Sequence, residues 1–232
     1  MFYLTIIVPV YNETNTILKI LNKIANIKLK KQIIIVDDGS TDGTREKLIK
    51  IKKKGLKILF HKNNLGKGAA IITAQKYVKG KYVVIQDADL EYNPKDLVKL
   101  LEPLKKKKTY VVYGSRVLGK KRYSSINFTS KIRIFFNHML TLISNFVNGQ
   151  NLTDAHTCYK MFDSKIFKKI KLKERGFAFC PEITTKIAKK KIKIIEVSIS
   201  YKGRSFNEGK KISYLDGFEA LIALIKYKFF NI

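Results

Sequence analysis

Short apolar runs alternate with amphipathic stretches along the first half of the chain. The runs are rich in β-branched and aromatic residues, which predicts buried strands. They cover residues 4–10, 33–36, 56–60, 82–85 and 110–113. Helices are predicted between them, near residues 17–24, 44–53, 67–78 and 94–104. This alternation is typical of an α/β fold with a mostly parallel, Rossmann-like sheet covered by helices on both faces.

The second half of the chain carries longer helices. Residues 124–147 predict a long helix of unusually apolar composition, and shorter helices at 164–170 and 182–189 precede a strand at 192–201. The last helix, 213–230, is amphipathic. Its apolar positions are Leu215, Phe218, Leu221, Ile222 and Ile225. Each of the two long helices could lie in a membrane interface or pack in the core; we favour the interface for the helix at 124–147 and the core for the last helix. With no internal repeat or flexible linker, residues 1–232 are expected to form a single domain.

Apolar spacing also predicts which face of the first helix is buried. Ile17, Leu18, Leu21 and Ile24 recur at intervals that place them on one side of a helix.

Polar turns follow three of the predicted strands. They hold Tyr11, the pair Asp37-Asp38, and the stretch from Asp87 to Asp89. In open parallel sheets, ligands bind beyond the carboxyl ends of the strands. We therefore expect the three turns to converge on one site.

Three carboxylates, those of Asp87, Asp89 and Glu91, lie between the strand at 82–85 and the next helix. Carboxylates this close repel one another unless a cation or hydrogen-bond donors lie between them. Asp89 and Glu91 have the alternating spacing of oxygen ligands for Mg or Mn, which is commonly held by one or two carboxylates plus substrate phosphates. The alternative is that the acidic residues only cap the helix beginning near Pro94.

The chain carries 47 Lys plus Arg against 18 Asp plus Glu, a formal net charge of +29. Such an excess implies attraction to an anionic partner, such as a phosphorylated substrate, an anionic membrane surface or nucleic acid. A solvated Lys surface set by an AT-rich genome is the alternative. The chain has no recognisable nucleic-acid-binding module, and its acidic turn would repel a phosphate backbone, so we expect no nucleic-acid partner.

Membrane-spanning helices are not expected, since no stretch reaches about 18 uninterrupted apolar residues. The start of the chain lacks the basic leader and cleavage site of a signal peptide. Cys158 and Cys180 form no short pairing motif, which favours a reducing compartment. These features predict a cytoplasmic protein that lies peripherally on the cytoplasmic face of the membrane. A monomer and a homo-oligomer are both compatible with the sequence.

Several short motifs resemble those of one enzyme family. They are Pro9-Val10-Tyr11-Asn12-Glu13, Asp37-Asp38-Gly39-Ser40-Thr41-Asp42-Gly43-Thr44, Asn64-Leu65-Gly66-Lys67-Gly68, Asp87-Ala88-Asp89 and Gly114-Ser115-Arg116. Their order resembles the family 2 glycosyltransferases, which have a GT-A fold. Later motifs resemble the branch of dolichyl-phosphate mannose and glucose synthases. These are Thr157-Cys158-Tyr159-Lys160, Pro181-Glu182-Ile183 and Tyr201-Lys202-Gly203-Arg204 through Glu208-Gly209-Lys210-Lys211.

The resemblance implies an inverting transfer of a hexose from a nucleotide sugar, of the UDP-glucose or GDP-mannose type, to a polyprenyl phosphate. Residues 1–116 would bind the nucleotide sugar and residues 117–232 would face the acceptor and the lipid. The implied donor-binding residues are Pro9, Tyr11, Glu13, Asp38, Lys67, Asp87, Ala88 and Asp89. Asp89 would hold Mg or Mn, and Glu91, which stands where relatives often carry Gln, is the second expected ligand.

The resemblance also implies fixed cations around the departing diphosphate. With Asp89, the expected catalytic residues are Arg116, Arg204 and Lys210, because charge builds on the diphosphate oxygens as the sugar leaves. Arg116 and Arg133 are expected to bind the acceptor phosphate, since the arginine fork suits phosphate oxygens.

The acceptor could instead be a hydroxyl of a growing surface polysaccharide or other glycan. A phosphate is already ionised at neutral pH and requires no general base, whereas a hydroxyl requires a positioned carboxylate. Asp154 and Glu182 are the candidates for that base. Both also match positions of the polyprenyl-phosphate branch, so the sequence leaves the acceptor open.

Overall fold

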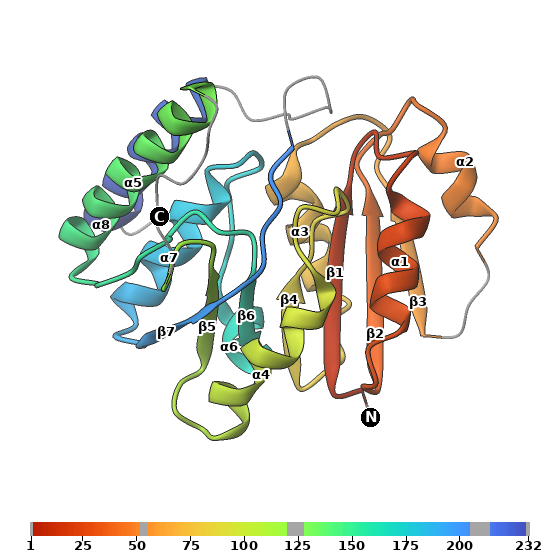
Figure 1. Cartoon of the computed structure of the whole chain (residues 1–232), viewed down its shortest axis with the longest axis horizontal. Helices are drawn as coiled ribbons and strands as arrows, with labels where there is room; N and C mark the ends of the chain where they lie inside the picture. The colour runs from red at the N-terminus through yellow and green to blue at the C-terminus, as the bar shows by residue number, and fades with distance from the viewer. Residues whose placement is uncertain (1, 52–54, 120–127, 205–213, 231–232) are drawn as a thin grey trace.

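The computed structural model describes residues 2–51, 55–119, 128–204 and 214–230. Its strands form one seven-stranded sheet in the order β3-β2-β1-β4-β6-β5-β7 (Figure 1). The strands are β1 (Leu4–Val10), β2 (Lys31–Asp37), β3 (Leu56–Phe60), β4 (Tyr82–Ile85), β5 (Val111–Ser115), β6 (Lys160–Asp163) and β7 (Ile194–Ser198). Neighbouring strands pair in parallel except at β6, which is antiparallel to β4 and β5. The α/β class and the mostly parallel sheet are confirmed.

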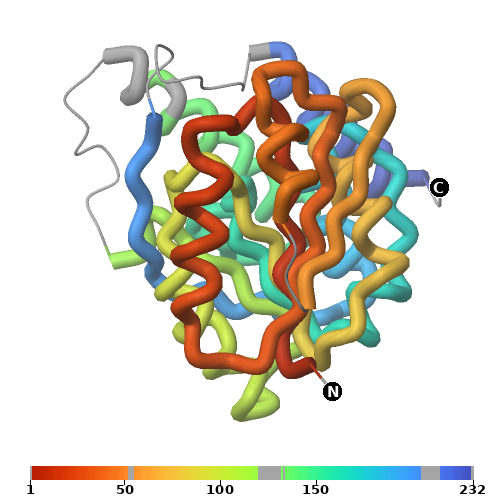
Figure 2. Tube along the Cα trace, turned by 90° about the vertical axis from the view of Figure 1, so that its right-hand side faces the viewer, coloured from red at the N-terminus to blue at the C-terminus, as the bar shows by residue number. Residues whose placement is uncertain are grey.

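Helices cover both faces of this sheet. They are α1 (Ile17–Ala25), α2 (Thr44–Ile49), α3 (Lys67–Gln75), α4 (Leu97–Lys105), α5 (Phe128–Asn148), α6 (Ser164–Lys169), α7 (Phe179–Lys189) and α8 (Tyr214–Phe229), with a short 3-10 helix η1 (Pro94–Asp96) before α4. Figures 1 and 2 show α1 and α3 on opposite faces. Strands β1, β4 and β5 are buried along their whole length, as expected for strands covered on both sides.

Two helices differ from their predicted form near their starts. Helix α7 begins at Phe179, ahead of Pro181, whereas the prediction began after the proline. Proline is tolerated in the first turn of a helix because its missing N–H is not needed there. In α1 the buried residues are Ile17, Ile20 and Ile24, and Leu18, which was predicted to be buried, is 45% exposed.

Strand β6 was not predicted from the sequence. It has only four residues and begins with Lys160, whose side chain is fully buried. The ammonium donates hydrogen bonds to the carbonyls of Ala155, at 3.0 Å, and Thr157, and lies 4.4 Å from the centre of the Tyr113 ring. A lysine is buried only where its ammonium finds such partners, so a lysine in the sequence does not indicate a buried strand. Lys160 therefore interrupts the apolar pattern by which β6 would be predicted.

Helices α5 and α8 lie side by side at the far edge of the molecule, beyond β7 (Figure 1). The prediction that the last helix packs in the core is wrong for most of its apolar stripe. Leu215 and Phe218 are 75% and 64% exposed, and the buried positions of α8 are Ala220, Ala223, Leu224 and Tyr227. No helix in the described part of the chain is long and apolar enough to cross a membrane.

Candidate active site

The turns after β1 and β2 are joined by backbone and side-chain hydrogen bonds. The Asp38 N–H donates to the Val10 carbonyl at 2.8 Å. The Asn12 N–H donates to the Ser40 hydroxyl at 2.9 Å, and the Asn12 carboxamide oxygen accepts from the Thr41 N–H at 2.8 Å. Asn12 has a positive φ of 49°, which asparagine tolerates in turns. The first two polar turns therefore form one continuous edge of the site.

Arg204 connects the first turn to the acidic turn after β4. Its guanidinium donates to the buried Glu13 at 3.0 and 3.2 Å and to Asp89 at 3.3 Å. The three turns therefore meet at one edge of the sheet, as the parallel arrangement predicted.

Asp38 is surrounded by protein hydrogen-bond donors. One carboxylate oxygen lies 2.6 Å from Nδ1 of His61 and accepts from the Leu65 N–H, and the other accepts from the Gly66 N–H at 2.8 Å. The side chain is almost fully buried. Asp38 thus holds the loop before α3 against the turn after β2.

Lys67, at the start of α3, forms an ion pair with Asp87. The two charged groups are 2.5 Å apart, and the ammonium also lies 3.4 Å from the Cys158 sulfur. Burial alone would lower the pKa of Lys67, but Asp87 raises it well above its ordinary value. One carboxylate of the acidic turn is therefore neutralised by a lysine, and Asp89 and Glu91 are the ones that face Arg204.

Asp89 has an unusually high proton affinity. Burial, followed by the charges of Asp87 and Glu91, raises the pKa of Asp89 to about 7, against the opposing effect of Arg204. A carboxylate in this position lacks enough positive charge around it. A further cation bound at this site would therefore be electrostatically favourable.

The carboxylates of the acidic turn could hold a divalent metal ion that protein side chains coordinate only in part. Asp89 and Glu91 supply carboxylate oxygens, and the Arg204 guanidinium stands beside both as a surrogate positive charge. Among the described residues, no three His, Cys, Asp or Glu side chains form a complete ligand cluster. Mg and Mn are often held in this incomplete way, because substrate phosphates and water fill the remaining positions.

Glu91 also binds the segment that follows β7. One carboxylate oxygen accepts from the Tyr201 hydroxyl at 2.7 Å and the other from the Arg204 N–H at 2.7 Å. The Tyr201 ring in turn lies 5.2 Å from the Arg116 guanidinium. Tyr201 therefore connects the acidic turn to the basic part of the site, and sequence reasoning assigned it no role although it lies in a recognised motif.

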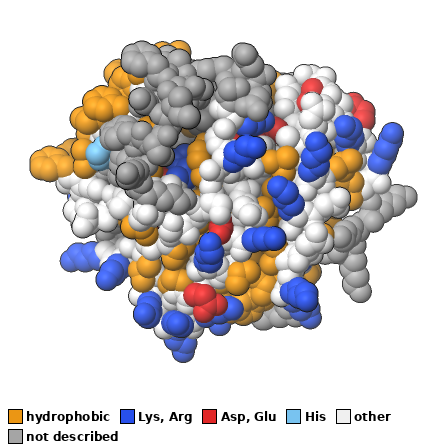
Figure 3. Space-filling model, viewed as in Figure 1, with side chains coloured by type: hydrophobic (Ala, Val, Ile, Leu, Met, Phe, Trp, Pro, Cys, Tyr) orange, Lys and Arg blue, Asp and Glu red, His pale blue; other side chains and the backbone are white. Residues whose placement is uncertain are grey.

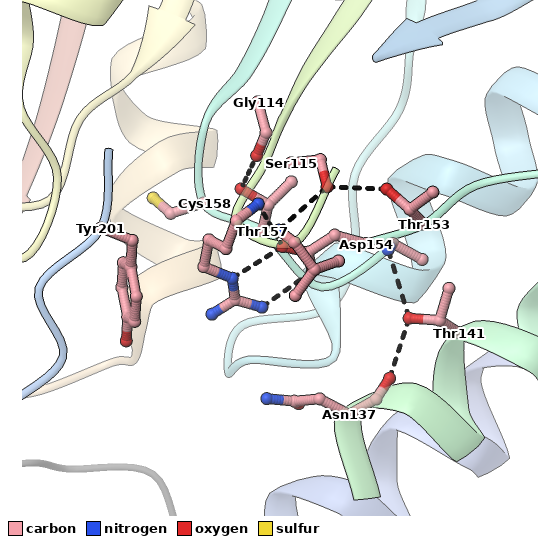
Figure 4. A network of polar contacts seen from close by, with 12 residues as sticks. Gly114, Ser115, Asn137, Thr141, Thr153, Asp154, Thr157, Cys158 and Tyr201 are labelled. Atoms are coloured by element: carbon pink, nitrogen blue, oxygen red, sulfur yellow. Dashed lines mark hydrogen bonds and ion pairs between the residues drawn. The ribbon is translucent and has the colours of Figure 1, made fainter. Parts of the chain in front are cut away.

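Arg116, which is partly buried, and the buried Asp154 form an ion pair with two parallel hydrogen bonds. Nε donates to one carboxylate oxygen at 2.7 Å and Nη2 to the other at 2.8 Å, and the Arg116 backbone N–H donates to the same group. Burial alone would raise the pKa of Asp154, but Arg116 lowers it below its ordinary value. Within the described residues, Nη1 of Arg116 makes no hydrogen bond. Figure 4 shows Asp154 within a network of polar contacts that reaches Thr141 of α5.

Glu182, the other candidate base, is fully buried. Its carboxylate accepts from the N–H groups of Lys173 and Glu174, at 2.8 and 2.9 Å, and from the Lys186 ammonium at 2.6 Å. These contacts hold the loop before α7. Both candidate bases are therefore engaged by protein groups.

Four more residues were predicted to belong to the site, namely Pro9, Ala88, Lys210 and Arg133. Pro9 is buried in β1, and Ala88 is buried in the acidic turn. Lys210 lies outside the described residues. Arg133 lies in α5, but its side chain is outside the described part of the structure.

The fold and the arrangement of this site define a GT-A-like glycosyltransferase domain. The sequence comparison agrees, because the model of the family described as Glycosyl transferase family 2 matches residues 5–171. The chain therefore belongs to this family.

Two similar proteins have names that include a lipid phosphate. A UDP-N-acetylglucosamine–dolichyl-phosphate N-acetylglucosaminyltransferase from Methanococcus voltae is 26% identical over 96% of this chain and 95% of its own length. A dolichyl-phosphate beta-glucosyltransferase from Saccharomyces cerevisiae is 30% identical over 86% of this chain and 66% of its own length. These relatives are consistent with the polyprenyl-phosphate branch of the family.

Solved structures of glucosyl-3-phosphoglycerate synthase from Mycobacterium tuberculosis share the fold. One has a TM-score of 0.71 and 15% identity, covering 100% of this chain and 82% of that chain. Another contains Mn2+, UDP and glucosyl-3-phosphoglycerate, with a TM-score of 0.69 and 16% identity, covering 97% of this chain and 80% of that chain. At this level of identity the likeness establishes the fold alone.

Proposed function

We propose that the protein is an inverting glycosyltransferase that moves a hexose from a nucleotide sugar to a polyprenyl phosphate at the membrane surface. The donor is of the UDP-glucose or GDP-mannose type, and the name of the Methanococcus voltae relative adds UDP-N-acetylglucosamine as a donor to test. The observation that carries the proposal is the Arg116–Asp154 pair. A carboxylate that accepts three hydrogen bonds and whose pKa is lowered is a weak base, whereas a fixed guanidinium suits a phosphate.

In the proposed reaction, an acceptor phosphate oxygen attacks the anomeric carbon on the face opposite the leaving group. The new carbon–oxygen bond forms as the bond to the nucleoside diphosphate breaks, and the electron pair of that bond goes to the diphosphate. The acceptor is already ionised, so no proton must be removed. Arg116 would orient the acceptor phosphate through its remaining N–H groups, and Arg133 would assist it.

On the donor side, Pro9, Tyr11, Glu13 and Asp38 would line the nucleoside pocket, with Lys67, Asp87 and Ala88 next to it. Arg204, with Lys210, would turn from the carboxylates toward the diphosphate and stabilise the charge that builds there. Asp89 and Glu91 would hold Mg or Mn, which when bound supplies positive charge to the diphosphate oxygens.

The surface formed by α5 and α8 supports action at a membrane. Large apolar side chains are exposed along both helices. They are Phe135, Phe136, Met139, Leu142 and Phe146 on α5, and Leu215, Phe218, Ile222, Ile225 and Phe229 on α8. Figure 3 shows hydrophobic side chains gathered at this edge of the molecule. Exposed patches of this kind commonly mark membrane or protein contacts, and the basic chain would add attraction to anionic lipid.

The test is transfer of labelled sugar into lipid. Purified protein is incubated with Mn or Mg and with labelled UDP-glucose, GDP-mannose or UDP-N-acetylglucosamine, with and without polyprenyl phosphate, and label in the organic phase is counted. We expect metal-dependent label from one donor that is lost in Asp89→Ala and kept in Glu102→Gln, which alters an exposed carboxylate of α4. Absence of lipid label with every donor would refute the proposed acceptor.

The alternative is transfer to a glycan hydroxyl, with Asp154 as the base. Asp154→Asn separates the two functions. Hydroxyl transfer would be abolished, because the proton of the hydroxyl would have no acceptor, whereas phosphate transfer would only be weakened through Arg116.

A further inference from the structure

Glu196 lies on β7, outside every motif that the sequence singled out, and contacts the loop that holds Arg116. One carboxylate oxygen accepts from the Thr153 N–H at 2.7 Å and from the Thr153 hydroxyl at 3.0 Å. The other accepts from the Asp154 N–H at 2.9 Å. All three hydrogen bonds go to two consecutive residues of a loop, and Glu196 itself is partly buried.

The same two loop residues fix both sides of Arg116. The Asp154 side chain holds the Arg116 guanidinium and backbone N–H. The Thr153 hydroxyl lies 2.7 Å from the Ser115 hydroxyl, which accepts from the backbone N–H groups of residues 117 and 118. Figure 4 shows Ser115, Thr153 and Asp154 joined in this network. A shift of the loop would therefore move the arginine and the backbone around it together.

Glu196 is suited to this task because a carboxylate only accepts hydrogen bonds. Each oxygen can accept more than one, so three donors from the loop are satisfied at once. An amide of the same shape has one accepting oxygen and a nitrogen that donates. Replacing the carboxylate by an amide would therefore set two donors against each other at one of the two loop N–H groups.

The backbone of β7 does not depend on this side chain. Glu196 stands opposite Tyr113 in the parallel register of β5 and β7, and that pairing is made by main-chain groups over the length of both strands. The side chain is thus free to serve the loop without being needed for the sheet.

We propose that Glu196 is a positioning residue that sets the orientation of Arg116 through the backbone of Thr153 and Asp154. The role of Arg116 toward an acceptor phosphate rests on the proposed function, whereas the linkage from Glu196 to Arg116 stands on the contacts alone. Loss of the Glu196 carboxylate disturbs acceptor use and leaves the donor side, around Asp38 and Asp89, unchanged.

The experiment compares Glu196→Gln with Glu102→Gln, which makes the same chemical change at an exposed side chain paired only with Lys105 among the described residues. Kinetics are measured with a short, water-soluble prenyl phosphate. We expect kcat/KM for the acceptor to fall about tenfold or more in Glu196→Gln, because misplacement of a substrate-orienting group is costly. The Kd of the nucleoside diphosphate, measured by calorimetry with Mn and UDP or GDP, stays within about twofold of the wild-type value. Equal losses on the acceptor and donor sides would overturn the proposal.

A double-mutant cycle tests whether the effect passes through Asp154. If it does, Glu196→Gln costs much less in the Asp154→Asn background than in the wild type. Thr153→Val, which removes the hydroxyl between Ser115 and Glu196, gives a smaller loss in the same direction. Fully additive effects of Glu196→Gln with both Asp154→Asn and Thr153→Val would show that Glu196 acts elsewhere.

Hydrogen–deuterium exchange makes the outcome independent of the reaction. Faster exchange of the backbone N–H groups at residues 115–118 and 153–154 in Glu196→Gln supports the linkage, and unchanged exchange at 115–118 refutes it. If the wild type transfers no sugar to any lipid phosphate, the proposed function fails, and the exchange result still decides the linkage.

Discussion

Arg204 donates hydrogen bonds to both carboxylate oxygens of Glu13, at 3.0 and 3.2 Å, although the two residues are 191 positions apart. These hydrogen bonds hold the segment after β7 against the turn after β1. The same guanidinium lies 3.3 Å from Asp89 and 3.9 Å from Glu91. Arg204 and a divalent metal would therefore be alternative sources of positive charge for the acidic turn.

Replacing this arginine is expected to make the protein depend on metal for stability. In Arg204→Met, the carboxylates lose a partly buried partner, which costs roughly 1–3 kcal/mol of unfolding free energy without metal. Saturating Mn should restore more stability to the variant than it adds to the wild type, because it binds only the folded site. Urea denaturation with and without Mn measures both quantities.

Arg45→Met is the matched control for this prediction. Arg45 pairs at 2.8 Å with the buried Asp37, at the end of β2 and not in the acidic turn. Its loss should lower stability without increasing the stabilisation by Mn. An equal response of the two variants to Mn would contradict the idea that Arg204 and metal are alternatives.

The apolar surface of α5 and α8 leads to a prediction about membranes. Phe146 and Phe218 are 90% and 64% exposed. Burying a Phe side chain contributes roughly 1.5–3 kcal/mol, so Phe146→Ser with Phe218→Ser should weaken binding to vesicles containing anionic lipid by tenfold or more, as about 1.4 kcal/mol corresponds to each factor of ten. Vesicle sedimentation measures this loss, and turnover of a short soluble acceptor should be unaffected.

Phe60→Ser controls for the loss of an exposed aromatic side chain. Phe60 is 42% exposed but lies on β3, at the opposite edge of the sheet. It should leave vesicle binding unchanged. Vesicle binding that falls equally in both variants would assign the interaction to general hydrophobicity or charge rather than to α5 and α8.

The sequence predicted the meeting of the three polar turns better than it predicted the contacts around Arg116. Parallel strands bring their carboxyl ends to one edge, so the convergence of the turns near Tyr11, Asp38 and Asp89 follows from the alternation of strands and helices. The partners of each carboxylate do not follow, because they depend on tertiary packing. Nothing in the pattern indicates that Arg116 pairs with Asp154.

Strand β6 and the exposure of α8 were also not predicted from the sequence, for physical reasons. Strand β6 contains the buried Lys160, and a buried cation interrupts an apolar pattern even when its charge is satisfied. The apolar stripe of α8 has the spacing of a core helix, yet Leu215 and Phe218 face solvent. Spacing identifies an apolar face but does not identify what covers it.

His156 provides a prediction of pH dependence. Burial, followed by the nearby Lys160 ammonium, lowers the pKa of His156 to about 4. Its buried Nε2 has no hydrogen-bond partner among the described residues. The folded protein therefore holds this histidine neutral, whereas the unfolded chain takes up a proton near its usual pKa of about 6.5.

The sign follows from that difference in proton uptake. Stability from His156 is fully present above pH about 6.5 and is lost as the pH falls toward 4, by at most roughly 3 kcal/mol. His156→Gln cannot take up the proton, so its unfolding free energy should fall less steeply over this range. Denaturant titrations at pH 7, 6, 5 and 4 compare the two proteins. Parallel curves for the wild type and the variant would refute the assignment.

Gly68, beside the Lys67–Asp87 pair, gives a prediction of stability from close packing. A Cβ atom at Gly68 would lie 2.1 Å from the Glu174 carbonyl oxygen and 2.9 Å from that of Arg175. The latter carbonyl also accepts from the Ala69 N–H at 2.9 Å, so the loop cannot retreat without breaking that bond. Gly68→Ala should therefore destabilise the protein by roughly 1–3 kcal/mol.

Gly217→Ala is the matched control, since a Cβ there meets nothing within 4 Å in α8, and it should be neutral or stabilising by up to about 1 kcal/mol. Thermal unfolding should thus shift in opposite directions for the two variants, or shift only for Gly68→Ala, and an equal fall in both would show that the approach of residues 174–175 is not what makes the substitution at Gly68 destabilising.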